Sequence, residues 1–529
     1  MLPYVEKYEI GGGRAPSWEP AWQAAAGGCA FVLESGKDGR YTYLGTEIRS
    51  VLLGDLNEAR VIAVAGGGRG ETDGTAGGMA GAGISAASAQ GAGTPEGDRA
   101  SVPAVLRGAP LDLVKRWISP FTAPKVQGLP RFLGGIAGFW GYDVVRTIER
   151  LPVIARHDTP CPDYAFMRVD KLWIVDHEEH ALYLAVHAPV SAEDDDAALF
   201  GKYQRAAAET RKMKRQWDEW MNAAADGSAL GRIGRIRADI EAGRLNIDVE
   251  AVEGLQADFS REQFMEAVRR VQEYIRRGDV FQVNLSVRQR KRLDARPERV
   301  YEWLRHLNPS PYMAYLMFPD FKIVSGSPEL LVQLDGRRVR TRPIAGTRPR
   351  GATEEEDARL RDELLASAKE RAEHVMLVDL ERNDLGRISR YGTVRVDELM
   401  TVEMYSHVMH IVSEVSGELE DGKDAFDVIR AVFPGGTITG APKIRTMEII
   451  EELEPVRRGP YTGSIGWIDY CGDMEFNIVI RTLLVSGGIG YVQAGAGIVI
   501  DSDAAKEYTE SLNKAKALWK AIQYASLPD

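Results

Sequence analysis

Short runs of apolar residues, joined by glycine-rich turns, dominate the first part of the chain and are typical of β-strands. We expect strands at residues 29–33, 41–44, 172–176 and 181–187, and a glycine-rich strand region at 132–143. Apolar residues at helical spacing predict helices at 110–118 and at about 196–222.

The composition changes abruptly between residues 65 and 104, where glycine and alanine replace almost all large apolar side chains. Such a segment cannot offset its ordering entropy by burial, so we expect a disordered surface insertion. Its GGGRG stretch lacks the G-K-[ST] ending of a phosphate-binding loop. A second polar, glycine-rich stretch, 223–257, is expected to be a linker with a short helix.

The hydrophobic pattern becomes clearer after residue 258. Ser260, followed three residues later by Gln263, predicts a capping box, and the helix that it starts is expected to end at Gly278. Strands and helices then alternate irregularly, and we expect residues 321–325 and 330–334 to pair as antiparallel strands. The chain is therefore predicted to have an α+β layered fold. Its parts are an N-terminal region (1–222), the linker and a C-terminal domain (258–529).

Charge and composition mainly exclude functions. The 529 residues include 77 acidic and 66 basic side chains, a formal net charge of -11, which argues against a nucleic-acid-binding protein. The three cysteines form no C-x-x-C, so we expect neither a disulfide framework nor a zinc site. No run approaches the roughly 18 apolar residues of a membrane span. The N-terminus lacks signal-peptide features, and we expect a cytoplasmic protein without a membrane partner.

Two pairs of glutamates are candidates for a metal site. Glu370 and Glu373 lie in one predicted helix and Glu507 and Glu510 in another, and a spacing of three places each pair on one helical face. Four carboxylates suit a hard cation, of which Mg²⁺ is the natural choice. The alternative is that both pairs are solvated and form salt bridges with neighbouring lysines and arginines.

Two glycine-rich segments are candidates for binding an anion. In residues 434–455, a loop leads into a helix whose first N–H groups, with Lys443, can hold a negative charge. A flexible connector is the alternative. In residues 493–499, Gly495 and Gly497 interrupt a strand and let a ligand approach the main chain closely. A β-bulge is the alternative there.

Three single residues, Glu329, Arg481 and His410, could act on a substrate if they are buried. Glu329 precedes a strand, and burial would raise its pKa and make it a proton donor, although an isolated glutamate is often a surface residue. Arg481 stands among apolar residues and needs an anionic partner, either a substrate carboxylate or a structural ion pair. His410, in SHVMHIV, lacks an H-E-x-x-H pattern, so an acid–base role or a satisfied core histidine is expected.

Many long motifs of this chain resemble the chorismate-utilising family, which includes anthranilate synthase, aminodeoxychorismate synthase, isochorismate synthase and salicylate synthase. They cover nearly all of 259–529 in order, and weaker matches occur at VLESGKDGRYTYLG and FLGGIAGFWGYD. The motifs are GDVFQVNLS, NPSPYMAYL, GSPELL, RPIAGTRPRG, ERAEHVMLVDLERNDLG, SHVMHIVS, FPGGTITGAPK, YTGSIGW and QAGAGIVIDS. The resemblance implies two packed antiparallel sheets flanked by helices, with the site between them.

The resemblance also implies roles for individual residues in binding chorismate, a dianion. Glu373 and Glu510 would bind Mg²⁺, with Glu370 and Glu507 beside them through water. Glu329 would assist departure of the ring hydroxyl, because hydroxide is a poor leaving group. His410 and Thr347 complete the implied catalytic group. The implied substrate-binding residues are Gly346, Thr437, Lys443, Tyr461, Arg481, Gly495, Ala496 and Gly497.

The motifs also bear on which product is formed. Family members that add water to chorismate look as if they carry a lysine base at the position of Gln282. A neutral amide cannot activate water, so the resemblance disfavours an isochorismate synthase. FPGGTITGAPK, YTGSIGW and FNIVIRT are similar to aminodeoxychorismate synthases, which aminate C4 of chorismate. Ala345 departs from the lysine that many of them carry, so direct attack by ammonia is expected. The chain has no Gly-x-Cys-x-Gly elbow, which implies a separate glutamine amidotransferase subunit.

Two alternatives remain open. The chain could form anthranilate and pyruvate, as anthranilate synthases do, or it could be a non-catalytic subunit that binds tryptophan. The LES and NPSPYM segments match those that anthranilate synthases use for feedback inhibition, which implies a tryptophan pocket at Ser35, Pro311, Tyr312 and Met313. Related aminodeoxychorismate synthases can retain such a pocket as a structural feature, so it does not decide the product.

Overall fold

The computed structural model describes residues 1–11, 17–25, 28–36, 39–64, 104–225, 247–351, 353–404 and 408–527, together with Gly231, Gly234, Ala238 and Ala242. The expected insertion at 65–104 lies outside the described residues except for Ala104, which begins a strand. Much of the expected linker at 223–257 also lies outside them.

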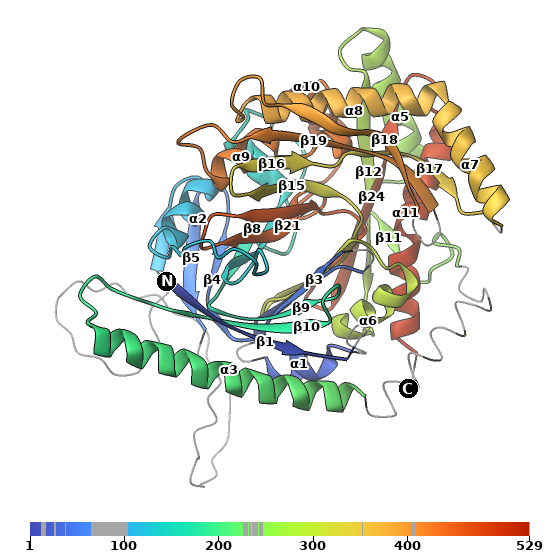
Figure 1. Ribbon diagram of the computed structural model, residues 1–529. Helices are drawn as coiled ribbons and strands as arrows, with labels where there is room; N and C mark the ends of the chain where they lie inside the picture. The colour runs from blue at the N-terminus through green and yellow to red at the C-terminus, as the bar shows by residue number, and fades with distance from the viewer. Residues whose placement is uncertain are drawn as a thin grey trace, which may run out of the picture.

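Within the described residues, the strands form two twelve-stranded sheets, A and B, whose strand pairs are antiparallel (Figure 1). Sheet A has the order β1 (Leu2–Glu9), β10 (Ala181–Ala188), β9 (Lys171–Asp176), β3 (Tyr41–Gly45), β2 (Ala30–Glu34), β13 (Tyr312–Met317), β14 (Phe321–Ser327), β23 (Thr482–Ser486), β24 (Ile489–Ile498), β12 (Gln282–Arg292) and β11 (Gln256–Ala257), and β20 (Gly440–Ala441) pairs with β12. Sheet B has the order β17 (Ile344–Pro349), β19 (Val408–Glu418), β16 (Arg338–Thr341), β15 (Leu330–Asp335), β22 (Met474–Ile478), β21 (Ser464–Asp469), β7 (Gly135–Trp140), β8 (Tyr164–Val169), β4 (Ile48–Gly54), β5 (Glu58–Ala63) and β6 (Ala104–Arg107), and β18 (Arg395–Met404) pairs with β19.

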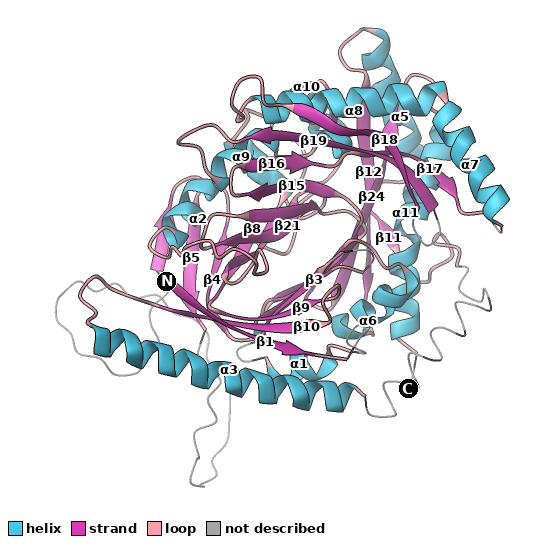
Figure 2. Ribbon diagram, viewed as in Figure 1, coloured by secondary structure: helices cyan, strands magenta, loops and turns pink. Residues whose placement is uncertain are grey.

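The two sheets pack against each other through an apolar core. Phe139 of sheet B meets Phe321 of sheet A edge to face, with ring centroids 6.0 Å apart. Helices cover much of the outer faces, as Figure 2 shows in cyan, so the central strands of each sheet are buried, whereas strands at the margins such as β1, β6 and β18 are partly exposed. Around sheet A lie α1 (Glu19–Ala24), α3 (Asp196–Ala224), α5 (Arg261–Arg276), α6 (Pro297–Leu307), α10 (Lys443–Leu453) and α11 (Ala504–Ala525), and around sheet B lie α2 (Pro110–Ile118), α7 (Glu354–Ala366), α8 (Ala368–Gly386) and α9 (Ala425–Val432). Two short 3₁₀ helices are η2 (Tyr142–Thr147) and η3 (Gly436–Ile438).

Several local predictions are confirmed. The helices expected at 110–118 and 196–222 are α2 and α3. Ser260 caps α5 in a capping box with Gln263, because each side chain accepts the other's backbone N–H. The α+β class with two packed antiparallel sheets is also confirmed. None of the described helices combines the length and apolarity needed to cross a membrane.

The predicted pairing of residues 321–325 with 330–334 is wrong. β14 pairs with β13 and β23 in sheet A, whereas β15 pairs with β16 and β22 in sheet B. The chain therefore leaves one sheet at Ser327 and enters the other at Leu330. Pro328, in the connection, has no N–H for a ladder and disfavours a continuous strand. The short connection between the two apolar segments favoured a hairpin, but β14 belongs to sheet A and β15 to sheet B.

Both sheets combine strands from the N-terminal and C-terminal regions. In sheet A, β2 pairs with β13, and in sheet B, β7 pairs with β21. The predicted boundary near residue 258 is thus not a boundary between separately hydrogen-bonded sheets.

Candidate active site

Glu329 lies at the crossing from sheet A to sheet B. Its main chain is held by Ile478, whose N–H donates to Glu329 O at 3.0 Å, and Ser327 Oγ donates to Ile478 O at 2.6 Å. The side chain is only 6% exposed. Burial raises the pKa of Glu329 to about 7, although Thr437, the main chain at Ile344, Arg481 and Lys514 act in the opposite direction. Glu329 therefore keeps a substantial protonated fraction near neutral pH.

A bulge in β17 brings together three residues that the sequence placed in the site. The register of β17 against β19 shifts between Ala345 and Thr347, and Gly346 has a φ of 66°, which favours glycine. His410 Nδ1 lies 3.1 Å from both Gly346 O and Thr347 Oγ1. Because a carbonyl only accepts, we assign the proton to Nδ1. Burial lowers the pKa of His410 to about 4, so the ring is neutral.

Arg481 lies at another crossing between the sheets, between β22 and β23. Its φ of 50° is left-handed, a conformation that costs energy for a non-glycine residue and is common at functional sites. The charge of Arg481 lowers the pKa of both Glu329 and His410, so the guanidinium lies near enough to both side chains to influence their ionisation. The structure thus brings the predicted proton donor, the histidine and the predicted anion-binding arginine close together, in a group that we call the Glu329 site.

The Gly495–Gly497 segment is the end of a regular strand and not a bulge. β12 pairs with β24 as far as Ile498, but β23 pairs with it only as far as Val492. The main chain beyond Val492 therefore has an edge that β23 does not cover, where a ligand can bind. Lys514 Nζ already donates to Gly495 O there, at 3.0 Å.

Gly497 makes room for a side chain that reaches the acidic residues. A Cβ on Gly497 would collide with the amide of Gln282. That amide instead extends to Glu373 and donates to its Oε1 at 3.2 Å. The absence of a side chain at Gly497 therefore helps to orient Glu373.

The acidic pair on α8 lies beside the bulge. Burial raises the pKa of Glu373, Gln282 opposes this, and the charge of Glu370 adds to it. Glu370 Oε1 lies 3.3 Å from Arg348 Nη1, and a Cβ on Gly346 would lie 3.1 Å from Glu370 Oε2. Glu370 thus lies close to the backbone of β17, while Glu373 contacts Gln282 of β12.

The acidic pair on α11 faces the same region. Burial raises the pKa of Glu507, and the charge of Glu510 adds to this, while Glu510 pairs with Lys514 at 2.9 Å. Lys369 of α8 and Lys514 of α11 each lower the pKa of both Glu373 and Glu507, so the two helices bring these acids near one another.

The four carboxylates have the chemistry of a magnesium site but do not form a closed cluster. In the part of the chain that the structure describes, no three His, Cys, Asp or Glu side chains converge closely enough to hold a metal ion. Within each pair the neighbouring charge raises a pKa, and a divalent cation would relieve that repulsion. The donor set therefore fits Mg²⁺ that also binds water and substrate oxygens.

Of three further predicted substrate-binding residues, Thr437 lies beside Glu329, whereas Lys443 and Tyr461 contact other residues of the protein. Thr437, in η3, faces the carboxyl of Glu329. Lys443 forms an ion pair with Asp384 and donates to Val432 O at 3.0 Å, so its charge is already matched by protein. Tyr461 is 8% exposed, and its ring lies 5.6 Å from the guanidinium carbon of Arg458.

Lys514 is a residue of this site that the sequence reasoning missed. It interacts with Glu510 and with the open edge of β24, and it lowers the pKa of Glu329. The signal was present, because Glu507, Glu510 and Lys514 are spaced by three and four and share one face of α11.

A separate cavity of about 760 Å³ lies between the sheets. All four residues of the predicted tryptophan pocket line it, namely Ser35, Pro311, Tyr312 and Met313. Trp467 and Tyr43 provide aromatic walls. Pro328 and Leu330 also line the cavity, so Glu329 is flanked on both sides by cavity residues.

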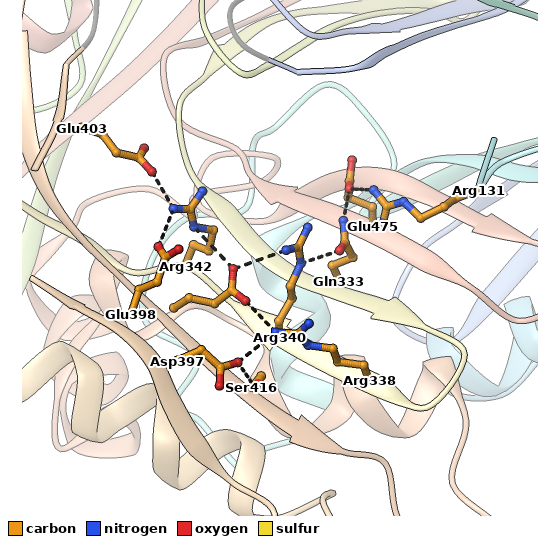
Figure 3. Close-up of polar contacts among 11 residues, drawn as sticks. Arg131, Gln333, Arg338, Arg340, Arg342, Asp397, Glu398, Glu403, Ser416 and Glu475 are labelled. Carbon is orange, nitrogen blue, oxygen red and sulfur yellow. Dashed lines mark hydrogen bonds and ion pairs between the residues drawn. The ribbon is translucent and has the colours of Figure 1, made fainter. Parts of the chain in front are cut away.

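Charged side chains on this cavity wall are extensively paired, as Figure 3 shows. Arg342 Nη2 lies 2.5 Å from Glu403 and 3.3 Å from Glu398. Arg340 donates to Gln333, which in turn donates to Glu475, and Glu475 also binds Arg131. The cavity combines aromatic surface with balanced charges, which suits a zwitterionic aromatic ligand.

Comparison with known proteins identifies one family. A family model described as chorismate binding enzyme matches residues 111–520. The chain is 49% identical over 416 residues to aminodeoxychorismate synthase component 1 of Bacillus subtilis, which covers 79% of this chain and 83% of that protein. It is 48% identical over 397 residues to anthranilate synthase component 1 of Thermus thermophilus, covering 75% and 79% respectively.

Solved structures agree with this assignment. Anthranilate synthase component I from Streptococcus pneumoniae superposes with a TM-score of 0.67 and 30% identity, covering 91% of this chain and 92% of that one. The menaquinone-specific isochorismate synthase of Escherichia coli has a TM-score of 0.59 at 17% identity, which supports the fold alone.

Proposed function

The chain belongs to the chorismate-binding enzyme family, and from that premise we propose that it is component 1 of an aminodeoxychorismate synthase. It would replace the C4 hydroxyl of chorismate with an amine and retain the enolpyruvyl group, which supplies p-aminobenzoate for folate synthesis in the cytoplasm. The 49% identity to the Bacillus subtilis enzyme supports this product.

The observation that carries the proposal is the position of Glu329. A buried carboxyl with a pKa of about 7, near the charge of Arg481, is suited to protonate a departing hydroxyl. Arg481 and Lys514, with the open edge of β24, would bind one carboxylate of the substrate. Bound Mg²⁺ would neutralise the other carboxylate, held by Glu373 and Glu510 with Glu370 and Glu507 beside them.

The attacking group is expected to be ammonia. Gln282 is a neutral amide engaged with Glu373, so it cannot serve as a base for water. Ala345, at 8% exposure in β17, provides no nucleophile. Ammonia would attack C4 directly and would be delivered by a glutamine amidotransferase subunit. His410, with its proton on Nδ1, would orient the ring or accept a proton.

The cavity between the sheets would bind tryptophan. Its aromatic walls and the residues Ser35, Pro311, Tyr312 and Met313 support this part of the proposal. A rise in melting temperature with added L-tryptophan, but not with L-alanine, would measure it. An unchanged melting temperature would contradict it.

Product analysis tests the proposed reaction. The protein is incubated with chorismate, Mg²⁺ and ammonium, first alone and then with an added aminodeoxychorismate lyase. We expect p-aminobenzoate only after the lyase is added. Fluorescent anthranilate together with pyruvate, without the lyase, would instead make the chain an anthranilate synthase, as its 48% identity to the Thermus thermophilus protein also allows. No turnover would favour a non-catalytic tryptophan-binding subunit.

A further inference from the structure

Arg458, in the loop after α10, is a buried arginine that contacts several segments around the Glu329 site. Its side chain is 1% exposed, and that of its partner Glu454 is 3% exposed. Arg458 Nε donates to Glu454 Oε2 at 2.9 Å, and Nη2 donates to Glu454 Oε1 at 2.7 Å. This bidentate pair fixes the plane of the guanidinium, which a single point of contact would leave free to turn.

The other N–H groups of Arg458 bind three more segments of the chain. Nη1 donates to Ile438 O of η3 at 2.9 Å and to Thr462 Oγ1, in the loop before β21, at 3.3 Å. Nη2 also donates to Asn284 O of β12 at 2.7 Å. All five N–H donors of the guanidinium therefore have acceptors within the protein.

One edge of β12 has a gap in its strand pairing. β24 pairs with the opposite edge, whereas on this edge β20 pairs with residues 282–283 and β11 with residues 289–290. Between them, residues 284–288 have no partner strand among the strands that the structure describes. The main-chain groups in such a gap need other partners, because a buried polar group without a hydrogen bond costs free energy.

Arg458 and Glu454 provide partners for this gap. Arg458 binds the carbonyl of Asn284. Glu454 Oε1 accepts from Ser286 N at 2.9 Å and from Ser286 Oγ at 2.7 Å. Across the sheet, these two residues of β12 lie opposite Gly495–Gly497 of β24. The ion pair therefore supports β12 next to the glycine segment that the family resemblance implies for substrate binding.

The bond to η3 connects Arg458 to the surroundings of Glu329. A Cβ on Gly435, just before η3, would lie 3.0 Å from Ile478 Cδ1 and 3.3 Å from Leu331 Cδ1. Ile478 in turn donates its N–H to Glu329 O at 3.0 Å. The η3 segment thus packs against residues that fix the main chain of the proposed proton donor.

The bond to Thr462 holds a turn that leads toward Arg481. Thr462 has a φ of 59°, a left-handed conformation that costs energy for a non-glycine residue. Its N–H donates to Val479 O at 2.8 Å, and Val479 lies two residues before Arg481. The ring of the adjacent Tyr461 lies 5.6 Å from the guanidinium carbon of Arg458. The turn therefore links Arg458 to a tyrosine and an arginine that are both implied in substrate binding.

We propose that Arg458 is a positioning residue which, held by Glu454, keeps β12, η3 and the Tyr461 turn in the arrangement that binds a substrate carboxylate. The inference rests on the proposed function, in which Arg481, Lys514 and the open edge of β24 bind one carboxylate of chorismate. Because all its N–H groups are engaged with protein, Arg458 acts through these segments and not by touching the substrate. The fork of five donors, more than the charge, holds the segments together.

The test compares Arg458→Lys with wild type by chorismate binding. The full chain is titrated with chorismate in the presence of Mg²⁺ and without ammonium, so that chorismate is not aminated, and calorimetry gives the Kd. Lysine keeps the charge but has three donors at one point, so it cannot hold all the segments. We expect the Kd to rise at least about tenfold, since a misplacement of about 1 Å can cost about 100-fold. With ammonium added, KM should change more than kcat, as expected for lost binding.

Arg288→Lys is the matched control. Arg288 is also buried on β12, with 4% of its side chain exposed, and it pairs with Asp258 at 2.7 Å and with Asp158 at 2.8 Å. Both lysine variants weaken a buried ion pair and should lower the stability to urea. Only Arg458→Lys should weaken chorismate binding. An unchanged Kd in Arg458→Lys, or an equal rise in both variants, would overturn the inference.

Glu454→Gln is a second variant, for the case in which circular dichroism shows that Arg458→Lys does not fold. The amide oxygen can still accept from Ser286, but the amide NH₂ cannot accept from Arg458. The Kd should rise in the same direction by a smaller factor, and an unchanged Kd would contradict the inference.

Wild type tests the premise separately. If wild type does not bind chorismate, the proposed function is wrong and the inference falls with it. If wild type binds chorismate and folded Arg458→Lys binds it equally well, the inference alone is wrong.

Discussion

The Glu329 site and the cavity between the sheets both contain buried carboxyl groups, but the pKa values of these groups are shifted in opposite directions. In the cavity, Glu34 accepts from Arg305 at 2.7 and 2.8 Å, and these bonds lower its pKa although burial opposes ionisation. In the Glu329 site, burial raises the pKa values of Glu329 and Glu373 because nearby cations compensate their charges only in part. A carboxylate paired with an arginine stays ionised and fixes the geometry of a binding cavity. A buried carboxyl without a full counter-charge retains its proton near neutral pH and can donate it in a reaction.

The largest expected effect is on turnover, when the proposed proton donor Glu329 is replaced. Glu329→Gln should lower kcat by about 10²–10⁴-fold, the range of general acid catalysis, while chorismate still binds. Initial rates with ammonium, together with chorismate binding by calorimetry, measure both quantities. Loss of binding with unchanged kcat would mean that Glu329 recognises substrate and does not donate a proton.

The matched charge should matter to stability rather than to chemistry. Glu34→Ala leaves Arg305 buried without its main partner and should cost about 3–5 kcal/mol of unfolding free energy. Urea denaturation measures this change. A cost below that of an exposed ion pair would show that water or another acid compensates Arg305.

The two carboxyls should give pH dependences of opposite sign. The folded pKa of Glu329 is raised from 4.5 to about 7, so its contribution to stability is complete below 4.5 and is lost as pH rises through 7. Relative to Glu329→Gln, wild type should lose roughly 3 kcal/mol by about pH 8.

The folded pKa of Glu34 is lowered, so its contribution is present above 4.5 and lost as pH falls through the folded value. Melting temperatures of both glutamine variants across pH, compared with wild type, give the two slopes. If the melting-temperature differences of the two variants changed with pH in the same direction, the proposed contrast between Glu329 and Glu34 would be wrong.

The Mg²⁺ dependence of the rate should distinguish a metal-binding glutamate from an exposed one. Glu373→Gln should raise the Mg²⁺ concentration for half-maximal rate by at least about tenfold, equivalent to about 1.4 kcal/mol. Glu363→Gln, an exposed acid on α7, is the matched control and should leave the titration unchanged. Equal titrations for wild type and Glu373→Gln would place the metal elsewhere.

The smallest effect is expected at the outer rim of the cavity. Arg338 is 53% exposed and pairs with Asp397 at 2.9 Å. Arg338→Met should therefore change unfolding free energy by less than about 1 kcal/mol. Urea denaturation beside Glu34→Ala provides the comparison, and a larger cost would mean that the whole arginine network is coupled.

Local patterns in the sequence predicted local structure well. The capping box at Ser260, the helices α2 and α3 and the glutamate pairs on α8 and α11 each depend on residues three or four apart. Family motifs then indicated which of these elements meet, which spacing alone does not specify.

Features that depend on distant contacts were missed. Spacing could not show that the runs on either side of Glu329 join different sheets, since that choice is made by β13, β23, β16 and β22. For the same reason, the spacing of Lys514 on α11 indicated that it shares a helix face with Glu507 and Glu510, but it could not indicate that the side chain reaches the main chain of Gly495.

The sharing of both sheets between the two ends of the chain limits how the protein can be divided. A fragment starting near residue 258 would expose β13 and β21 along edges that β2 and β7 normally cover. Both strands are rich in aromatic and aliphatic residues, which makes such open edges prone to pair with other molecules and aggregate. The C-terminal half is therefore not expected to be a stable unit for expression, because the N-terminal strands cover its open sheet edges.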